Sequence, residues 1–185
     1  MIELAAERPE DATARETLLD LTMPARFEKA SQRLREGRLP AEGLSLVARG
    51  ADGRLAGTVR LWYVTAGPGC PALLLGPLAV HPWFWHAGVG AQLMQAAMAE
   101  AARRGHGAIL LVGDAPYYGR FGFSSARTGQ LWMPGTYDRD RLLAVELEPG
   151  ALDGACGLIC PTGARTHSPA MAERTVVLHG LKQSA

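Results

Sequence analysis

One run of the chain constrains the fold more than any other: residues 73–112 combine a buried strand, a loop, a helix and a second buried strand. Residues 73–80 and 108–112 are apolar throughout, as strands covered on both faces are. Between them, residues 88–104 form an alanine-rich helix that Gly105 ends. Pro77 cannot donate to a strand ladder, so the first strand should lose pairing near its middle. The chain is therefore predicted to have a mixed α/β fold.

Weaker signals flank this run. Asp52-Gly53 lies between two apolar stretches and predicts a hairpin turn. Pro9 with two acids after it predicts a helix start, and Gly37 should close a second helical stretch. The further predicted elements are strands at 2–5, 44–48, 54–62, 131–133 and 142–147, and helices beginning at 9 and spanning 25–36.

The composition fits one folded domain and excludes several classes of protein. Hydrophobic residues make up 48% of the 185 residues, charged residues 20%, and the formal net charge is +1. A nucleic-acid binder usually carries a basic field, and a bilayer span needs about 20 apolar residues. The sequence shows neither, and its charged N-terminus lacks the apolar core of a signal peptide. We therefore expect a cytoplasmic protein that binds neither nucleic acid nor membrane.

The three cysteines, Cys70, Cys156 and Cys160, form an odd and sparse set that fits a reducing compartment. Cys156 and Cys160 are close in sequence, but no second pair of ligands with metal spacing accompanies them. We therefore expect small buried thiols and no metal site.

The glycines at 88 and 90 indicate an anion site at the start of the long helix. The first amides of a helix have no internal partner and lie at the positive end of its dipole, where phosphate binds. A dinucleotide site of the G-x-G-x-x-G type would need a third glycine at Leu93 and a tight turn directly after the strand. A phosphate site of another kind fits better, and a plain glycine-rich helix cap is the alternative.

Two motifs in register make a family resemblance specific. Val80-His81-Pro82, followed by residues 85–90 (WHAGVG), resembles the acetyl-CoA motif of the GNAT N-acetyltransferase superfamily, Gln/Arg-x-x-Gly-x-Gly/Ala. Residues 117–123 (YYGRFGF) look like the second signature of that superfamily, aromatic-Tyr-x-x-x-Gly-Phe. One helix and one strand separate the two motifs, as in the superfamily. The stretches 74–80 and 111–123 are similar to a bacterial subgroup labelled YhbS-like.

The resemblance implies a mixed sheet of six to seven strands, flanked by about four helices and splayed between the strands ending at Val80 and Val112. Pantetheine would lie in the splay as a short pseudo-strand, and pyrophosphate would rest on amides of residues 87–91. The acetyltransferase domain would span residues 1–157, and residues 158–185 would form an extension, with 175–178 as a possible added strand. The residues implied for cofactor binding are Leu78, Ala79, Val80, Trp85, His86, Ala87, Gly88, Val89, Gly90, Ala91, Tyr117, Arg120 and Phe121.

The implied chemistry is acetyl transfer from acetyl-CoA, the co-substrate, to a primary amine of a small molecule or a protein. A backbone amide near Leu78 or Ala79 would stabilise the charge on the thioester oxygen. Tyr118 matches the tyrosine that gives a proton to the departing thiolate, and a half-buried packing role is its alternative. No general base is evident, and His81 at the strand end is a weak candidate.

Two positions depart from the motif, because Trp85 and Ala87 replace its usual polar and basic residues. Their loss favours an alternative function, a catalytically weak acyl-CoA sensor or interaction module. The aromatic run 83–85 is expected to pack on the core or on a subunit partner, which leaves a homodimer open. The acceptor amine is unknown. Residues 26–38, which the resemblance assigns to the acceptor side, are mildly basic and are expected to form a solvated helix face.

Overall fold

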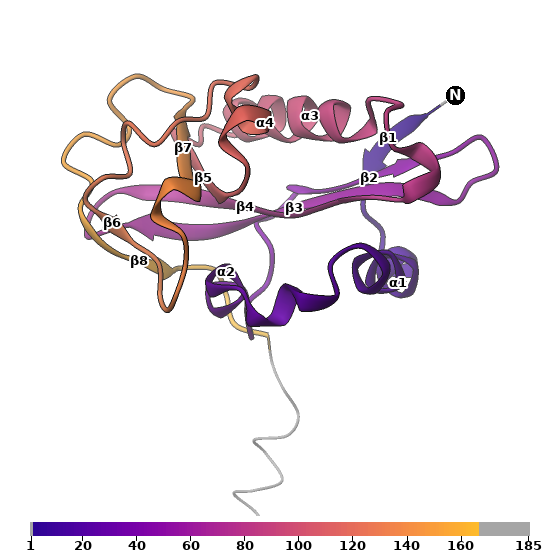
Figure 1. Ribbon diagram of the computed structural model, residues 1–185, viewed down its shortest axis with the longest axis horizontal. Helices are drawn as coiled ribbons and strands as arrows, with labels where there is room; N and C mark the ends of the chain where they lie inside the picture. The colour runs from indigo at the N-terminus through magenta and orange to yellow at the C-terminus, as the bar shows by residue number, and fades with distance from the viewer. Residues whose placement is uncertain (1, 167–185) are drawn as a thin grey trace, which may run out of the picture.

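The computed structural model describes residues 2–166 and is built on a mixed sheet (Figure 1). Its strands follow the order β1-β2-β3-β4-β5-β7, while β8 pairs with β3 and β6 off this path. The strands are β1 (Glu3–Ala6), β2 (Ser45–Arg49), β3 (Leu55–Ala66), β4 (Pro71–Val80), β5 (Ala108–Val112), β6 (Leu131–Trp132), β7 (Leu142–Glu146) and β8 (Gly157–Pro161). Among the strand pairs of the described residues, only β4–β5 and β6–β8 are parallel. The predicted mixed, splayed α/β architecture is confirmed.

Helices cover both faces of the sheet. In Figure 1, α3 (Val89–Arg103) and α4 (Ala115–Gly119) lie on one face, and α1 (Ala12–Thr22) and α2 (Ala30–Arg33) lie on the other. Helix α3 buries an apolar stripe at helical spacing against the sheet, which anchors its N-terminus beside the end of β4. The stripe consists of Val89, Leu93, Met94, Ala97 and Ala101. Single-turn 3₁₀ helices are η1 (Pro9–Asp11), η2 (Pro24–Glu28), η3 (Pro82–Phe84) and η4 (Arg139–Arg141).

The prediction of one continuous helix over residues 25–36 is wrong. Lys29 has an extended backbone (ψ 140°), which separates η2 from α2. Gly37, with φ of 65°, follows the turns after α2. The break turns the side chains of Arg26 and Arg35 inward, so the prediction of a solvated basic face also fails for these two buried residues.

Strands β4 and β5 pair over only two residues each, Leu73 with Ile109 and Leu74 with Leu110. Beyond that point β4 bulges: Leu75 is opposite Leu61 and Leu78 is opposite Val59 in β3. The Trp62 indole fixes the bulge by donating a 2.6 Å hydrogen bond to the carbonyl of Gly76. The interruption expected at Pro77 is therefore confirmed, and the two strands open a gap toward Val80 and Val112.

Other expectations have mixed outcomes. Cys156 is exposed and Cys70 and Cys160 are partly buried, so the prediction of buried thiols is wrong. Cys70 lies in the turn between β3 and β4, Cys156 directly precedes β8, and Cys160 lies within β8. Strand β8 begins at the proposed domain boundary and pairs with β3, and the possible strand at 175–178 lies outside the described residues. No helix in residues 2–166 has the length and apolar character to cross a membrane.

Candidate active site

The free edge of β4 lies at the gap. His81 donates its backbone N–H to the carbonyl of Ala56, and Ala79 is opposite Thr58 in the same register. Because backbone groups alternate between the two sides of an antiparallel strand, those of Ala79 point toward β3. The N–H and C=O groups of Leu78 and Val80 therefore point the other way, toward the gap. Of the two amides proposed for the thioester oxygen, this favours Leu78 over Ala79.

The N-terminus of α3 lies beside this edge. Gly88, the N-cap, has a left-handed backbone (φ 74°) that a side chain would strain. The first bond within the helix runs from Gln92 N–H to the Gly88 carbonyl, 3.0 Å. The amides of Val89, Gly90 and Ala91 consequently have no partner within the helix, and they lie at the positive end of its dipole.

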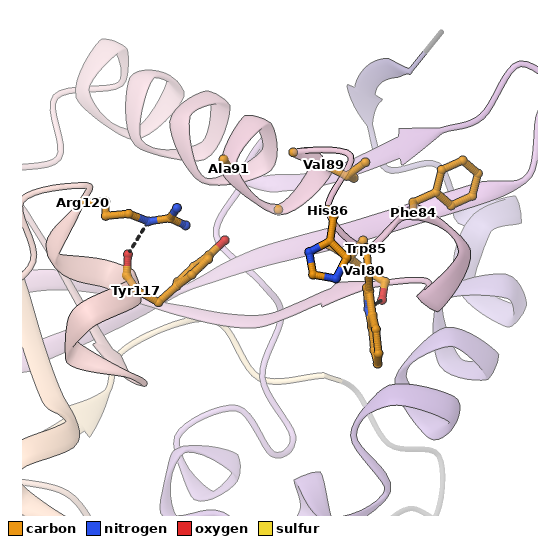
Figure 2. Close-up of a pocket in the computed structure, with 10 residues that line it drawn as sticks. Val80, Phe84, Trp85, His86, Val89, Ala91, Tyr117 and Arg120 are labelled. Atoms are coloured by element: carbon orange, nitrogen blue, oxygen red, sulfur yellow. Dashed lines mark hydrogen bonds between the residues drawn. The ribbon is translucent and has the colours of Figure 1, made fainter.

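A pocket of about 420 Å³ joins the end of β4 to these amides (Figure 2). No carboxylate is among its lining residues, and Arg120 adds a cation. The Arg120 guanidinium lies 4.5 Å from the centre of the Tyr117 ring, and its Nε donates to the Tyr117 carbonyl, 3.3 Å. Amides, a helix dipole and a guanidinium together suit an anionic ligand such as a phosphate group. The lining residues are Val80, Phe84, Trp85, His86, Gly88, Val89, Gly90, Ala91, Tyr117 and Arg120.

Most residues proposed from the motifs meet in this pocket, but some do not. Leu78 lines a neighbouring pocket with Tyr118. Ala79 is buried beside α1, and Phe121 packs on the core and the Tyr117 ring. Ala87 donates its N–H to the Phe84 carbonyl. Its amide is therefore already paired, and the amides proposed to bind phosphate are reduced to those that follow Ala87. Phe84 also lines the pocket, although the sequence analysis assigned the aromatic run 83–85 to packing and did not propose Phe84 for cofactor binding.

Gly90 is required by a close contact. A Cβ atom built on Gly90 would lie 3.0 Å from the Tyr117 hydroxyl and 3.5 Å from a methyl group of Val80. The contact brings α4 against the first turn of α3. A branched side chain at Gly90 would therefore fill the space in front of the free amides.

Tyr118 lies on the other side of the gap, in α4. Its ring packs so closely on Gly113 that a Cβ there would be 2.1 Å from a ring carbon. Burial, reinforced by Tyr117, raises the pKa of the Tyr118 hydroxyl to about 12. The hydroxyl makes no hydrogen bond within residues 2–166. Tyr118 is therefore a protonated donor at neutral pH, lining a pocket with Gly76, Leu78 and Leu111.

Trp85 occupies part of the β4 edge. Its indole Nε1 donates to the Val80 carbonyl at 2.9 Å, although the side chain is 59% exposed. Trp83 is exposed as well, and only Phe84 of this aromatic run packs on the core, so the expected core packing holds for one of the three. Trp85 therefore competes for an acceptor group that faces the gap.

His81 serves the loop. Its Nδ1 accepts from the Trp83 N–H at 3.3 Å, and its ring packs edge-on against Trp83. It is not among the residues lining the pockets beside Val80 or Tyr118. These contacts assign His81 to capping η3, and they weaken its candidacy as a base.

A sheet that opens beside a helix N-terminus, with a tyrosine across the gap, defines the fold class of CoA-dependent acyltransferases. The chain belongs to the GNAT acetyltransferase family, whose family model, "Acetyltransferase (GNAT) family", matches residues 12–123. The resemblance inferred from the two motifs is thereby confirmed.

Solved structures agree with this assignment. The chain is similar to the GNAT family N-acetyltransferase YhbS from Escherichia coli, solved in complex with CoA, with 29% identity over 87% of this chain and 89% of that one and a TM-score of 0.72. A GNAT acetyltransferase from Brucella melitensis, solved with acetyl-CoA, shares the fold at 24% identity over 92% and 98%, with a TM-score of 0.60. A comparison with curated proteins found no match.

Proposed function

We propose that the protein is an acetyl-CoA-dependent N-acetyltransferase that acetylates a primary amine. One observation carries the proposal: the β4 edge at Leu78 and Val80, where β5 no longer pairs with it, leads directly to the amides of Val89, Gly90 and Ala91 that have no partner within α3. A ligand with amide groups at one end and phosphates at the other matches that sequence of partners. CoA has this order, and YhbS from E. coli was solved in complex with it.

The residues present fit such a ligand. Pantetheine would pair with the backbone of Leu78 and Val80, as an added strand does. Its pyrophosphate would lie on the α3 amides, with the Arg120 guanidinium beside it. A Cβ at Gly90 would occupy part of this space.

The chemistry then requires two groups from the protein. The acceptor amine forms a C–N bond with the thioester carbonyl carbon, the C–S bond breaks, and the amine loses one proton while the sulfur gains one. The Leu78 N–H, which points into the gap, would stabilise the charge on the carbonyl oxygen. Tyr118 would give its proton to the sulfur. The raised pKa of Tyr118 keeps this proton on its hydroxyl at neutral pH.

Among residues 2–166, no carboxylate or histidine lines the pocket around Tyr118. The amine would therefore arrive neutral or lose its proton to water. We also propose that the protein is bacterial and is located in the cytoplasm.

The test is CoA release from acetyl-CoA, corrected for hydrolysis, with a panel of primary amines. Amine-dependent release with a mass-confirmed N-acetyl product is expected. Release that no amine increases would contradict the proposal.

A second candidate, an acyl-CoA-binding sensor, is favoured by the contact between Trp85 and the Val80 carbonyl, which obstructs the gap. A sensor would bind CoA with a measurable Kd and release no CoA with any amine. The availability of the Tyr118 hydroxyl argues for the enzyme.

A further inference from the structure

The inference concerns the acceptor amine and rests on the proposed function. Arg35 follows α2, a helix that lies on the face of the sheet opposite α3 (Figure 1), and it lines the pocket that contains Tyr118 and Leu78. Only 8% of its surface is exposed. A guanidinium removed from water to this extent is costly unless an anion or several acceptors compensate it.

The hydrogen bonds of Arg35 satisfy only part of its guanidinium group. Its Nε donates to the Ser31 carbonyl at 3.1 Å and one terminal nitrogen donates to the Ser31 hydroxyl at 3.0 Å. Within residues 2–166 no carboxylate lies within salt-bridge distance of it. The second terminal nitrogen, Nη1, has no hydrogen-bond partner among these residues. No side-chain nitrogen of the described residues is both sealed from solvent and without a partner, so solvent reaches Nη1. Arg35 lines both the pocket of Tyr118 and a second pocket that contains Glu16. It also faces the β4 bulge, 3.9 Å from where a Cβ on Gly76 would lie.

The surroundings are cationic. Lys29 and Arg26 line the same pocket, and no Asp or Glu does. Arg26 is already paired with Asp20 at 2.6 Å and Glu16 at 3.1 Å, whereas Arg35 is not. Burial and the charge of Arg26 lower the pKa of Arg35 to about 10, which leaves it cationic at neutral pH. The remaining lining is apolar, with Leu75, Leu78 and Leu111 among it.

We propose that the acceptor is an amine that also bears a carboxylate, as an amino acid does, and that Arg35 Nη1 binds this carboxylate while the amine faces the gap beside Tyr118. The pocket holds about 60 Å³, enough for a carboxylate-sized group, and it adjoins a second pocket of about 170 Å³ that shares Lys29, Ser31 and Val112. Polyamines are disfavoured beside Arg35 and Lys29, because their remaining cationic groups would meet these two charges, while the adjoining pocket contains both Asp138 and Arg141.

The test compares kcat/KM for amines that differ only in this charge: the standard amino acids, β-alanine and 4-aminobutyrate against their carboxamides, with spermidine added. Wild-type protein should prefer at least one carboxylate over its carboxamide by roughly 10- to 100-fold. Arg35→Met keeps an apolar stem but removes the charge, and it should bring this ratio close to one. Arg33→Met, an equal charge change at an exposed residue of α2, should leave the ratio unchanged.

The ratio of kcat/KM for a carboxylate to kcat/KM for its carboxamide, measured in one variant, does not depend on the fraction of folded protein. Partial unfolding of Arg35→Met therefore cannot by itself bring this ratio close to one. Amines acetylated with no preference for carboxylates would overturn the inference and leave the proposed function standing. An unchanged ratio in Arg35→Met, with a higher Kd for acetyl-CoA, would assign Arg35 to the co-substrate and overturn it too. Measured CoA binding without acetylation of any amine would overturn both.

Discussion

Tyr118 shows how one side chain depends on its surroundings. Its ring fits against Gly113, where any side chain would collide, and burial raises the pKa of its hydroxyl to about 12. The second aromatic signature predicted a tyrosine at this position, but neither the Gly113 contact nor the degree of burial could be read from it. Such contacts arise between segments that only the folded chain brings together.

The Tyr118→Phe variant should keep CoA binding and slow acetyl transfer. The ring and its packing on Gly113 survive, and only the proton donor is lost, so kcat should fall about 10²- to 10⁴-fold with little change in the Kd of acetyl-CoA. Stopped-flow and steady-state CoA release measure both quantities. An unchanged kcat would return Tyr118 to a packing role, and a lost Kd would make it a binding residue.

The pH profile of the wild-type enzyme provides a matched check on Tyr118. Raising the pH deprotonates the acceptor amine and should increase kcat. Because the raised pKa keeps Tyr118 protonated until pH approaches about 12, no loss of the acid is expected below about pH 10. A fall in kcat between pH 8 and 9.5, absent in Tyr118→Phe, would contradict the assignment.

Trp85 leads to a prediction about affinity. Trp85→Phe removes the indole donor and frees the Val80 carbonyl for pantetheine, so CoA should bind more tightly. Trp85→Arg should do the same and add a charge beside the phosphates, worth about 1.5–3 kcal/mol. Calorimetric titration of both variants separates the effects, since equal gains would assign the benefit to the freed carbonyl. Weaker binding in both would show that the Trp85 ring itself contacts CoA.

Among the elements, α3 and the β4–β5 gap were predictable and α2, α4 and β8 were not. Helix α3 carries strong signals, glycine at its start and alanine along its length, and Pro77 marked the β4 interruption. The break at Lys29 was hidden, because its neighbours favour a helix and tertiary packing decides the backbone there. Helix α4 has one turn, and β8 is formed by pairing with β3, so neither has a periodic pattern of its own.

The α3 N-terminus leads to a prediction at the same scale. Gly90→Val should abolish CoA binding while the protein stays folded, because the added methyl groups would fill the space before the free amides and press on Tyr117. Calorimetry gives the affinity and circular dichroism the fold. Gly129→Val is a matched control, since a Cβ at Gly129 has open space around it and the residue lies outside the pocket. A folded Gly90→Val protein with wild-type CoA affinity would place the phosphates elsewhere.

At the scale of the whole molecule, the splayed sheet divides two kinds of surface. Helices α3 and α4 cover one face, and α1 and α2 cover the other (Figure 1). The pocket proposed for the phosphates lies at the start of α3, and the pocket proposed for the acceptor is lined by residues on either side of α2. In the proposed function, the two substrates would meet in the gap between β4 and β5, at Leu78 and Tyr118. The family motifs predicted the first face, whereas the second depends on the buried Arg35, which the basic character of residues 26–38 had suggested to be solvated.

Thermal unfolding with CoA tests the central claim most directly. At 100 times its Kd, CoA bound only to the folded state adds about 2.7 kcal/mol to the free energy of unfolding. For a chain of 185 residues, this corresponds to a rise in Tm of roughly 5–10 °C. CoA and acetyl-CoA should both produce this rise, and NAD⁺, which needs a different glycine pattern, should not. An unchanged Tm at millimolar CoA would contradict the account.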